Sequence, residues 1–261
     1  MSHPEQQKFV ECLSKYLVPH LDQASFGVKV LEVGSCDVNG SIRGFFSGMD
    51  YVGADLAPGP GVDVVGSGHE LSYADGHFDV SLSCESFEHN PYWKETFHNM
   101  VRMTREGGLV AFTCASRGRL EHGTRRTDPK LSPGTQNVGF DYYRNLSERD
   151  FTRIFPLSSW FSRFYFWYVA RSRDLYFVGV KGTENALSKA PWETFNEEVA
   201  KIKYLSSSDR SLRKFAHRVI QAPLALPMHI LDDSQFQKVA IPFDRLVKQL
   251  AQGVRKLRTH S

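Results

Sequence analysis

The sequence has few cysteines, no long apolar run and almost no net charge. Its four cysteines, at positions 12, 36, 84 and 114, are widely spaced, and no Cys-x-x-Cys or His-x-x-x-His pair accompanies them. Neither a zinc site nor a disulfide framework is therefore predicted, and we expect reduced thiols and no metal. The longest apolar stretches, 160–170 and 220–231, are too short to cross a bilayer or are broken by Arg and Pro. The polar start lacks the apolar segment of a signal peptide, so we expect a cytoplasmic protein.

The small net charge of +3 results from cancellation between regions. Residues 1–188 hold 19 Lys and Arg against 22 Asp and Glu, whereas residues 189–261 hold 13 against 7. Within the first part, residues 117–173 hold 11 basic and 5 acidic side chains. The chain thus combines an acidic body with two basic sections, which are where an anionic substrate or surface would be sought.

Short β-branched runs alternate with helical segments in the first half of the chain. Runs that predict buried strands lie at 28–33, 51–55, 62–65, 78–83 and 109–113. Before the last of them, Trp93, Phe97, Met100 and Val101 share one face of a predicted helix. Aromatic and β-branched runs at 160–170 and 175–180 predict a closing antiparallel hairpin. We therefore expect an α/β fold: a Rossmann-like, mostly parallel, seven-stranded sheet with an antiparallel last hairpin and helices on both faces.

Two segments fall outside this alternation. Residues 116–150 are rich in Gly, Pro, Arg and Thr and predict a basic lid or substrate loop. We place a domain boundary at 188/189, which gives a domain of residues 1–188 and a basic helical C-terminal extension of residues 189–261. Helical spacing of apolar residues predicts two amphipathic helices in the extension, joined by residues 221–233; these apolar residues are Leu212, Phe215, Val219, Phe243, Leu246, Val247, Leu250, Val254 and Leu257.

The segment after the first strand carries the clearest chemical signal. Gly34 follows the strand directly and permits close approach of backbone to a ligand, and Glu32 lies two positions before it. Asp55 ends the second strand, where an acid about 20 residues on accepts the hydroxyls of a ribose. A glycine turn together with a ribose acid predicts a nucleoside cofactor.

Four stretches follow one another in order: Leu31-Glu-Val-Gly34, Val52-Gly-Ala-Asp55, Phe78-Asp-Val-Ser-Leu-Ser-Cys-Glu-Ser-Phe-Glu-His89 and Met103-Thr-Arg-Glu-Gly-Gly-Leu-Val-Ala-Phe112. In these stretches the chain resembles the class I S-adenosylmethionine-dependent methyltransferases, in particular the small-molecule enzymes with a methyltransferase domain of type 11. The resemblance implies S-adenosylmethionine as cofactor. It places Glu32, Gly34 and the neighbouring Ser35 at the methionine part and Asp55 with Leu56 at the ribose. It also places Ser67, Gly68 and His69 beside the adenine, and Ser83, Cys84 and Glu85 near the sulfonium.

The first loop departs from the family pattern, and a dinucleotide-binding alternative exists. Cys36 and Val38 stand where further glycines are common, and Ser67 stands where an acid often accepts the adenine amino group. A pyrophosphate requires a Gly-x-Gly-x-x-Gly turn, which is missing. Since Glu32 would repel phosphate and attract a cationic sulfonium compound with an amine, we favour the methyl donor.

Three residues are candidates for a general base that removes a proton from the methyl acceptor. His89 follows the fourth strand, and His122 lies in the basic loop with Glu121 beside it to orient the imidazole. Asp141 is the third. Two of these residues also have structural interpretations. His89 could only line the cofactor pocket, and His122 could lie in a solvent-exposed turn. Arg125 and Arg126 are candidates for clamping a phosphate or carboxylate, and Tyr142 and Tyr143 for the substrate wall.

The expected activity is O-methylation of a hydroxyl on a sugar, glycan or secondary metabolite, with an anionic acceptor as a hypothesis based on charge. Alternatives are N- or C-methylation of a small molecule and a non-catalytic protein of the same fold that binds the cofactor or docks a partner. We expect no nucleic acid partner, because the body is acidic. The basic C-terminal helices leave open a peripheral contact with the inner membrane face, self-association, or packing on the body.

Overall fold

A seven-stranded sheet forms the centre of the computed structural model, which describes residues 4–21, 27–182, 187–208 and 222–258. The strand order is β3-β2-β1-β4-β5-β7-β6, with β7 antiparallel to β5 and to β6 and all other pairs parallel. The strands are β1 (Lys29–Val33), β2 (Asp50–Asp55), β3 (Val64–Val65), β4 (Phe78–Cys84), β5 (Thr104–Ala115), β6 (Phe161–Val169) and β7 (Asp174–Lys181). The predicted fold class is confirmed, including the antiparallel last hairpin.

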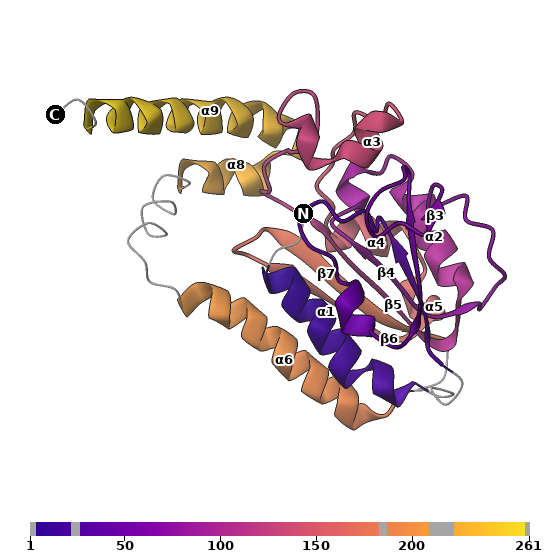
Figure 1. Ribbon diagram of the computed structural model, residues 1–261. Coiled ribbons are helices and arrows are strands. Elements are labelled where there is room, and N and C mark those ends of the chain that lie inside the picture. The colour runs from indigo at the N-terminus through magenta and orange to yellow at the C-terminus, as the bar shows by residue number, and fades with distance from the viewer. Residues whose placement is uncertain (1–3, 22–26, 183–186, 209–221, 259–261) are drawn as a thin grey trace.

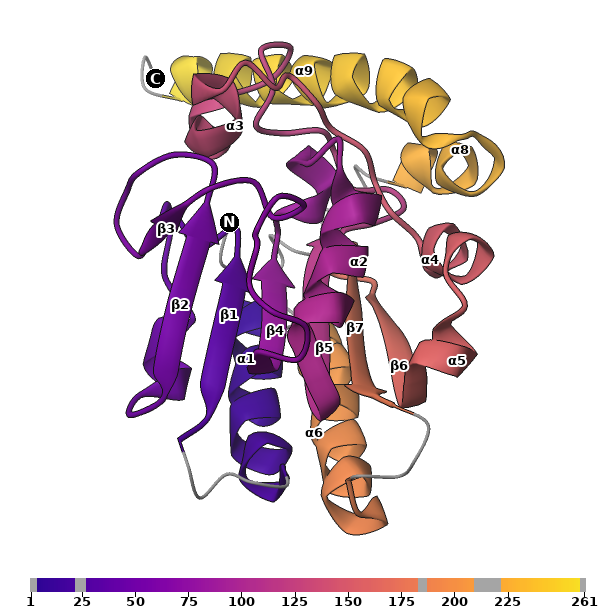
Figure 2. The same ribbon diagram turned by 90° about the vertical axis from the view of Figure 1, so that its right-hand side faces the viewer.

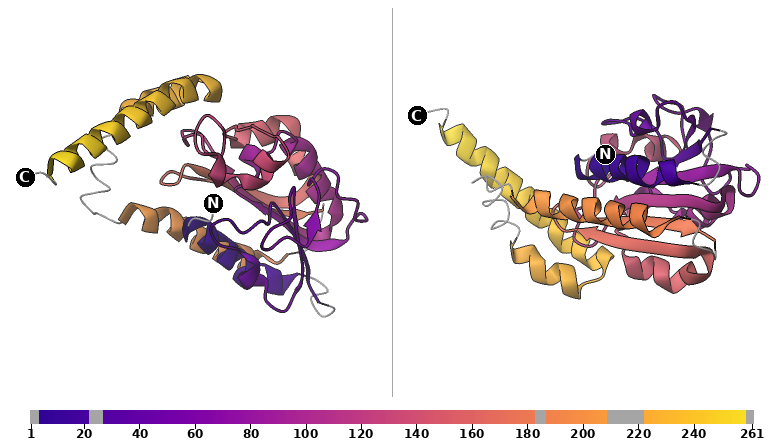
Figure 3. Two further views of the ribbon diagram at one scale, coloured as in Figure 1. Left: turned by 45° about the horizontal axis from the view of Figure 1, so that its top comes forward. Right: turned by 90° about the horizontal axis from the view of Figure 1, so that it is seen from below.

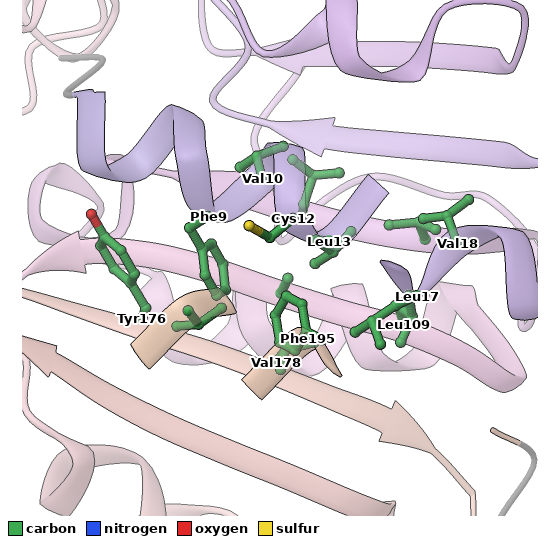
Figure 4. Close-up of a cluster of buried hydrophobic side chains, with 14 of the residues drawn as sticks. Phe9, Val10, Cys12, Leu13, Leu17, Val18, Leu109, Tyr176, Val178 and Phe195 are labelled. Atoms are coloured by element: carbon green, nitrogen blue, oxygen red, sulfur yellow. The ribbon is translucent and has the colours of Figure 1, made fainter. Parts of the chain in front are cut away.

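One face of the sheet is covered by α1 (Pro4–Tyr16) and α6 (Lys189–Ser208) (Figure 1). Alternate strand residues point to this face because strand side chains have a period of two. Phe9 of α1 contacts Tyr176 of β7 and Phe195 of α6, with ring centroids 4.9 and 5.9 Å apart, and Figure 4 shows these rings among aliphatic neighbours. The helix that begins at the predicted 188/189 boundary is therefore part of the core packing.

The opposite face is covered by α2 (Trp93–Met103), α4 (Glu148–Ile154) and α5 (Leu157–Trp160) (Figure 2). The four apolar residues predicted to share one helix face are buried in α2. Aromatic rings fill this layer: Phe112 of β5 stacks on Phe151 of α4 at 4.5 Å and on Phe177 of β7 at 5.0 Å. This aromatic layer holds the end of β5 in place, and residues 116–150 leave the sheet from that end.

Residues 116–150, which we call the lid, cross the carboxyl edge of the sheet. They contain two short helical turns, η5 (Pro129–Leu131) and α3 (Pro133–Asn137), and lead into α4, where Ser147 and Asp150 form a capping box. Two further single turns, η1 (Val18–His20) and η3 (Arg43–Phe46), flank β1, and η4 (Phe87–His89) follows β4. The parallel strands β1, β2 and β4 all end beneath the lid (Figure 2).

The C-terminal segment returns to the lid. After η6 (Ala222–Leu224), α8 (Ala225–Ile230) lies within the segment predicted to be only a connection, and α9 (Asp233–Arg258) is the predicted second helix. Leu212, Phe215 and Val219 of the predicted first helix lie outside the described residues. Figures 2 and 3 show α9 crossing above α3 and continuing past the body of the domain. Among the described residues, no helix is both long and apolar enough to cross a membrane.

Candidate functional site

The turn after β1 accepts only glycine at position 34. Gly34 has φ +85°, and a Cβ atom there would lie 2.5 Å from the Ser86 hydroxyl oxygen. Its N–H donates to the Ala54 carbonyl at 2.8 Å, which pins the turn to the end of β2. The backbone turn after β1 therefore carries no side chain at position 34, where it lies at the carboxyl edge of the sheet.

Glu32 points into the same region from β1. Its side chain is buried, and Oε2 accepts a hydrogen bond of 2.6 Å from the Tyr51 hydroxyl. Burial raises the pKa of Glu32 to about 7, against the opposing effects of Tyr51 and of the nearby Arg43 charge. A carboxyl group that titrates near neutrality is well suited to gain charge when a cation arrives.

Asp55 ends β2 and organises the loop around it. Its Oδ2 accepts from the Cys36 N–H at 2.9 Å and its Oδ1 from the Leu56 N–H at 2.7 Å. Burial raises the pKa of Asp55, and these backbone hydrogen bonds oppose the rise. The backbone of the lid passes close by, since a Cβ atom on Gly134 would lie 2.9 Å from Oδ1.

The turn at residues 67–69 is held by α2 from below. Asn99 donates to the Gly68 carbonyl at 2.9 Å, and the Ser67 hydroxyl lies 2.6 Å from Nδ1 of His69. The His69 ring stacks on Tyr92, with centroids 4.3 Å apart. The turn presents Ser67 and Gly68 to the pocket, whereas His69 contacts Ser67 and Tyr92.

One pocket joins these elements. Most of the predicted cofactor residues line it: Glu32, Gly34, Ser35, Asp55, Leu56, Ser67, Gly68, Cys84 and Glu85. His89 and residues 131–135 of the lid line it as well. His69 does not, and neither does Ser83, whose buried hydroxyl donates to the Val33 carbonyl at 2.8 Å and so ties β4 to β1.

A buried polar cluster adjoins this pocket, at the ends of β4, β5 and β7. We use this name for Glu85, Glu88, His89, Arg119, His122, Tyr143 and Asp174. The His89 and His122 rings are nearly perpendicular, with centroids 4.9 Å apart, and Tyr143 lies 5.4 and 5.0 Å from them. Burial lowers the pKa of His122 to about 4, helped by the Arg119 charge, and lowers that of His89 well below its usual range. Both imidazoles are neutral at neutral pH.

Acidic side chains surround the two imidazoles. Burial and the Glu85 charge raise the pKa of Glu88 to about 8 and that of Asp174 to about 9. The Arg119 guanidinium lies 3.5 Å from Oδ1 of Asp174, and its charge opposes the rise in the pKa of that carboxyl group. Glu85 itself has φ +52°, a conformation that non-glycine residues adopt rarely and mainly where function or packing demands it. Sequence reasoning missed Glu88, Arg119 and Asp174.

The lid places the other predicted substrate residues away from the pocket. Arg125 and Arg126 are exposed, and Arg126 forms an ion pair with Glu121. Asp141 is also exposed and accepts from the Arg125 N–H at 2.8 Å, which holds the pKa of Asp141 below its usual range. Tyr142 is half-buried and does not line the pocket.

The predicted orientation of His122 by Glu121 is wrong. The Glu121 carboxyl binds Arg126 and the Thr124 hydroxyl instead, and Nδ1 of His122 lies 3.1 Å from the Leu120 carbonyl. A backbone carbonyl can only accept, so it orients the ring in place of the acid.

Helix α9 fastens the lid from outside. Gln237 is buried, donates to the Arg119 carbonyl at 2.8 Å and accepts from the Glu121 N–H at 3.0 Å. Asp233 accepts from the backbone and side-chain amides of Asn145 at 3.0 and 2.7 Å. Phe236 and its neighbours form a small apolar core with Leu224, Ala240 and Leu120. The C-terminal segment is therefore bound to lid residues beside the site, although it does not line the pocket itself.

Comparison with known proteins gives a family for the central part of the chain. Residues 31–112 match the family profile described as a methyltransferase domain. Uncharacterized methyltransferases from Mycobacterium sp. strains KMS and MCS are 39% identical over 93 residues, which is 30% of this chain. The chain spans 36% of the length of these relatives in that match.

Several solved structures are also similar, at low identity. The CurJ carbon methyltransferase is 14% identical with a TM-score of 0.46, covering 68% of this chain and 54% of that one. Geranyl diphosphate methyltransferase in complex with SAM is 12% identical with a TM-score of 0.42, covering 67% and 85%. A possible histamine N-methyltransferase from Thermotoga maritima is 16% identical with a TM-score of 0.39, covering 67% and 93%.

Proposed function

Residues 31–112 belong to the class I S-adenosylmethionine-dependent methyltransferases, and from this premise we propose that the chain binds S-adenosylmethionine and transfers its methyl group to a small molecule. The observation that carries the proposal is the single pocket that unites Glu32, Asp55 and His89 at the carboxyl edge of the sheet. In open α/β sheets, ligands bind at this edge.

Each part of the pocket suits one part of the cofactor. Glu32, buried on β1, matches the positively charged amine of the methionine portion. Asp55 is placed to accept the hydroxyls of the ribose, and Ser67 and Gly68 offer a hydroxyl and backbone groups to the adenine. Cys84 and Glu85 then lie on the side of the reacting sulfonium. His69 does not line the pocket and would act on the adenine only through its contact with Ser67.

For the acceptor we propose a hydroxyl on a sugar, glycan or secondary metabolite. In the reaction the acceptor oxygen forms a bond to the methyl carbon while the bond from that carbon to sulfur breaks. The acceptor proton must go to a base, and His89 is the neutral imidazole that lines the pocket. His122 adjoins it, whereas Asp141 faces solvent. Because Arg125 and Arg126 lie outside the pocket, the structure lends no support to a phosphate clamp.

Calorimetric titration with S-adenosylmethionine tests the cofactor, with Asp55→Ala as the variant and Asp50→Ala, at the exposed opposite end of β2, as the matched control. Hydrogen bonds to a charged group contribute about 1.5–3 kcal/mol each, so Asp55→Ala should weaken binding by at least about 10-fold. The control should bind as the parent does. Absence of binding by the folded parent protein would overturn the cofactor assignment.

Methyl transfer itself is tested with a labelled donor and a cell extract, followed by mass spectrometry of the labelled product. A labelled O-methyl compound formed by the parent and not by Asp55→Ala supports the proposed activity. Label on nitrogen or carbon would replace the proposed acceptor, and cofactor binding without any labelled product would identify a non-catalytic protein.

A further inference from the structure

Three side chains with metal-ligand chemistry meet where the lid crosses β4. Glu88 and His89 come from η4, directly after β4, and His122 comes from the lid. One donor atom of each lies within 4.8 Å of the others. Glu88 and His89 are buried, and His122 is largely enclosed. Sequence spacing could not predict this cluster, because His122 lies 33 positions after His89 and the fold of the lid brings the two together.

The two imidazoles are oriented by backbone carbonyls. The His89 ring donates to the Tyr142 carbonyl, and its Nδ1 is buried with no hydrogen-bond partner among the described residues. In His122 the roles are exchanged, since Nδ1 donates to the Leu120 carbonyl at 3.1 Å and leaves Nε2 with the lone pair. Imidazoles that bind metals characteristically donate their other N–H to a carbonyl or carboxylate in this way.

Glu88 completes the set with a carboxylate. Neither of its oxygens makes a well-formed hydrogen bond within the described part of the chain, although both are buried. The buried polar cluster also holds Glu85 and Asp174, with Arg119 as its positive member. Three carboxylates beside one guanidinium carry an excess of negative charge. A divalent cation would neutralise this excess, which otherwise requires protonation of the carboxylates.

We propose that Glu88, His89 and His122 bind a divalent transition-metal ion, with Zn²⁺ as the ion that best suits the donor set. Two imidazoles and one carboxylate are the protein ligands of catalytic zinc sites that keep a position open. The donor atoms already lie within 4.8 Å of one another, close enough for small side-chain adjustments to give ligand bonds of about 2.0–2.2 Å. The ion would thus fix His122, and with it the lid, over the pocket that His89 lines.

The role of the ion rests on the proposed function. If the acceptor hydroxyl occupied the open coordination position of the ion, the hydroxyl would become more acidic and would lose its proton to water. The resulting alkoxide would form the new bond to the methyl carbon. His89 and His122 would then act as ligands, and acidification of the hydroxyl by the ion would take the place of the general base, the role that His89 has in the reaction without metal.

Metal binding can be measured without cofactor or acceptor. The parent protein is stripped with EDTA, titrated with Zn²⁺ by calorimetry and analysed for retained zinc by elemental analysis. We expect one ion per chain in the parent and in Asp55→Ala. His122→Ala should bind at least about 100-fold more weakly, because even the loss of an outer partner costs 10–100-fold. His98→Ala, an exposed histidine on α2, is the matched control and should bind as the parent does.

Co²⁺ substitution and thermal unfolding guard against misfolded variants. The visible spectrum of Co²⁺ reports its ligands, so Glu88→Gln should alter the spectrum, and Zn²⁺ should raise the Tm of the parent but not of folded His122→Ala. Equal zinc affinity of the parent and a folded His122→Ala, or no stoichiometric zinc in the parent, would overturn the site. A failure of the proposed function would instead appear as an absence of cofactor binding or methyl transfer in a chain that still binds zinc.

Discussion

The titration of Glu32 should make cofactor affinity depend on pH. In the free protein the pKa of Glu32 is raised to about 7 by burial, so below pH 7 its carboxyl group is mostly protonated. In the proposed complex, the ammonium group of S-adenosylmethionine would bind the ionised form and would have to displace that proton. Affinity should therefore rise with pH up to about 7. It should fall again above about 8, where an α-amino group loses its own charge.

The magnitude follows from proton linkage. Each pH unit below the pKa of Glu32 costs a factor of ten in affinity, or about 1.4 kcal/mol. Because half of the Glu32 carboxyl groups are already protonated at pH 7, the dissociation constant should increase about 50-fold between pH 7 and pH 5. Glu32→Gln keeps the size of the side chain and an oxygen for the Tyr51 hydroxyl, but it cannot titrate. The variant should bind about 10- to 100-fold more weakly at pH 7.5 and lose the acidic limb centred on pH 7.

Calorimetry at a series of pH values, in buffers of different ionisation enthalpy, measures both the affinity and the protons released. Asp50→Asn, an exposed acid at the start of β2, serves as control and should keep the acidic limb. Because burial also raises the pKa of Asp55, a second and weaker acidic limb is expected to remain in Glu32→Gln. An acidic limb with an unmoved midpoint in Glu32→Gln, or a parent affinity that is flat from pH 5 to 7, would refute this account.

Two further substitutions test the turn and the lid. Gly34→Ala combines a positive φ with a clash against Ser86, so it should lower the free energy of unfolding by at least about 1–2 kcal/mol. Adding Ser86→Gly to this variant should restore only the part of the stability that the clash removes. Full recovery of the free energy of unfolding in denaturant titrations would disprove the requirement for a positive φ. Gln237→Ala leaves the Glu121 N–H without its partner, at a cost of about 1–3 kcal/mol, and removes one of the two donors to the Arg119 carbonyl, which Asn145 also binds. Hydrogen exchange of residues 117–127 should accelerate in this variant but not in Lys238→Ala, and equal protection in both would exclude the buttressing role of α9.

The sheet could be predicted because its signals are local. The strand runs are β-branched and end at turn residues, and residues 28–33 and 78–83 predict β1 and β4 to within a residue at each end. The cofactor side of the pocket is predictable for a similar reason. Gly34 and Asp55 end adjacent parallel strands, so the sheet itself brings them together.

The buried polar cluster forms through contacts between segments that are distant in the sequence, so no local sequence pattern predicts it. Asp174 stands in a charged hairpin turn and resembles a solvent-exposed residue, yet it is fully buried beside Arg119. The basic lid looked like an anion-binding loop because formal charge counts do not show which cations are paired. Arg126 is neutralised by Glu121, and Arg119 is committed to Asp174.

The C-terminal helix matters to the cofactor through the lid. The backbone at Gly134 passes over Asp55 so closely that a side chain there would touch the carboxylate. A ribose that reaches Asp55 must therefore displace this part of the lid, and the hydrogen bonds of Gln237 and Asp233 to the lid resist the displacement. A substitution that weakens the contacts of α9 with the lid should consequently increase both the association rate and the dissociation rate of the cofactor. A substitution confined to the pocket wall, by contrast, should act mainly on dissociation.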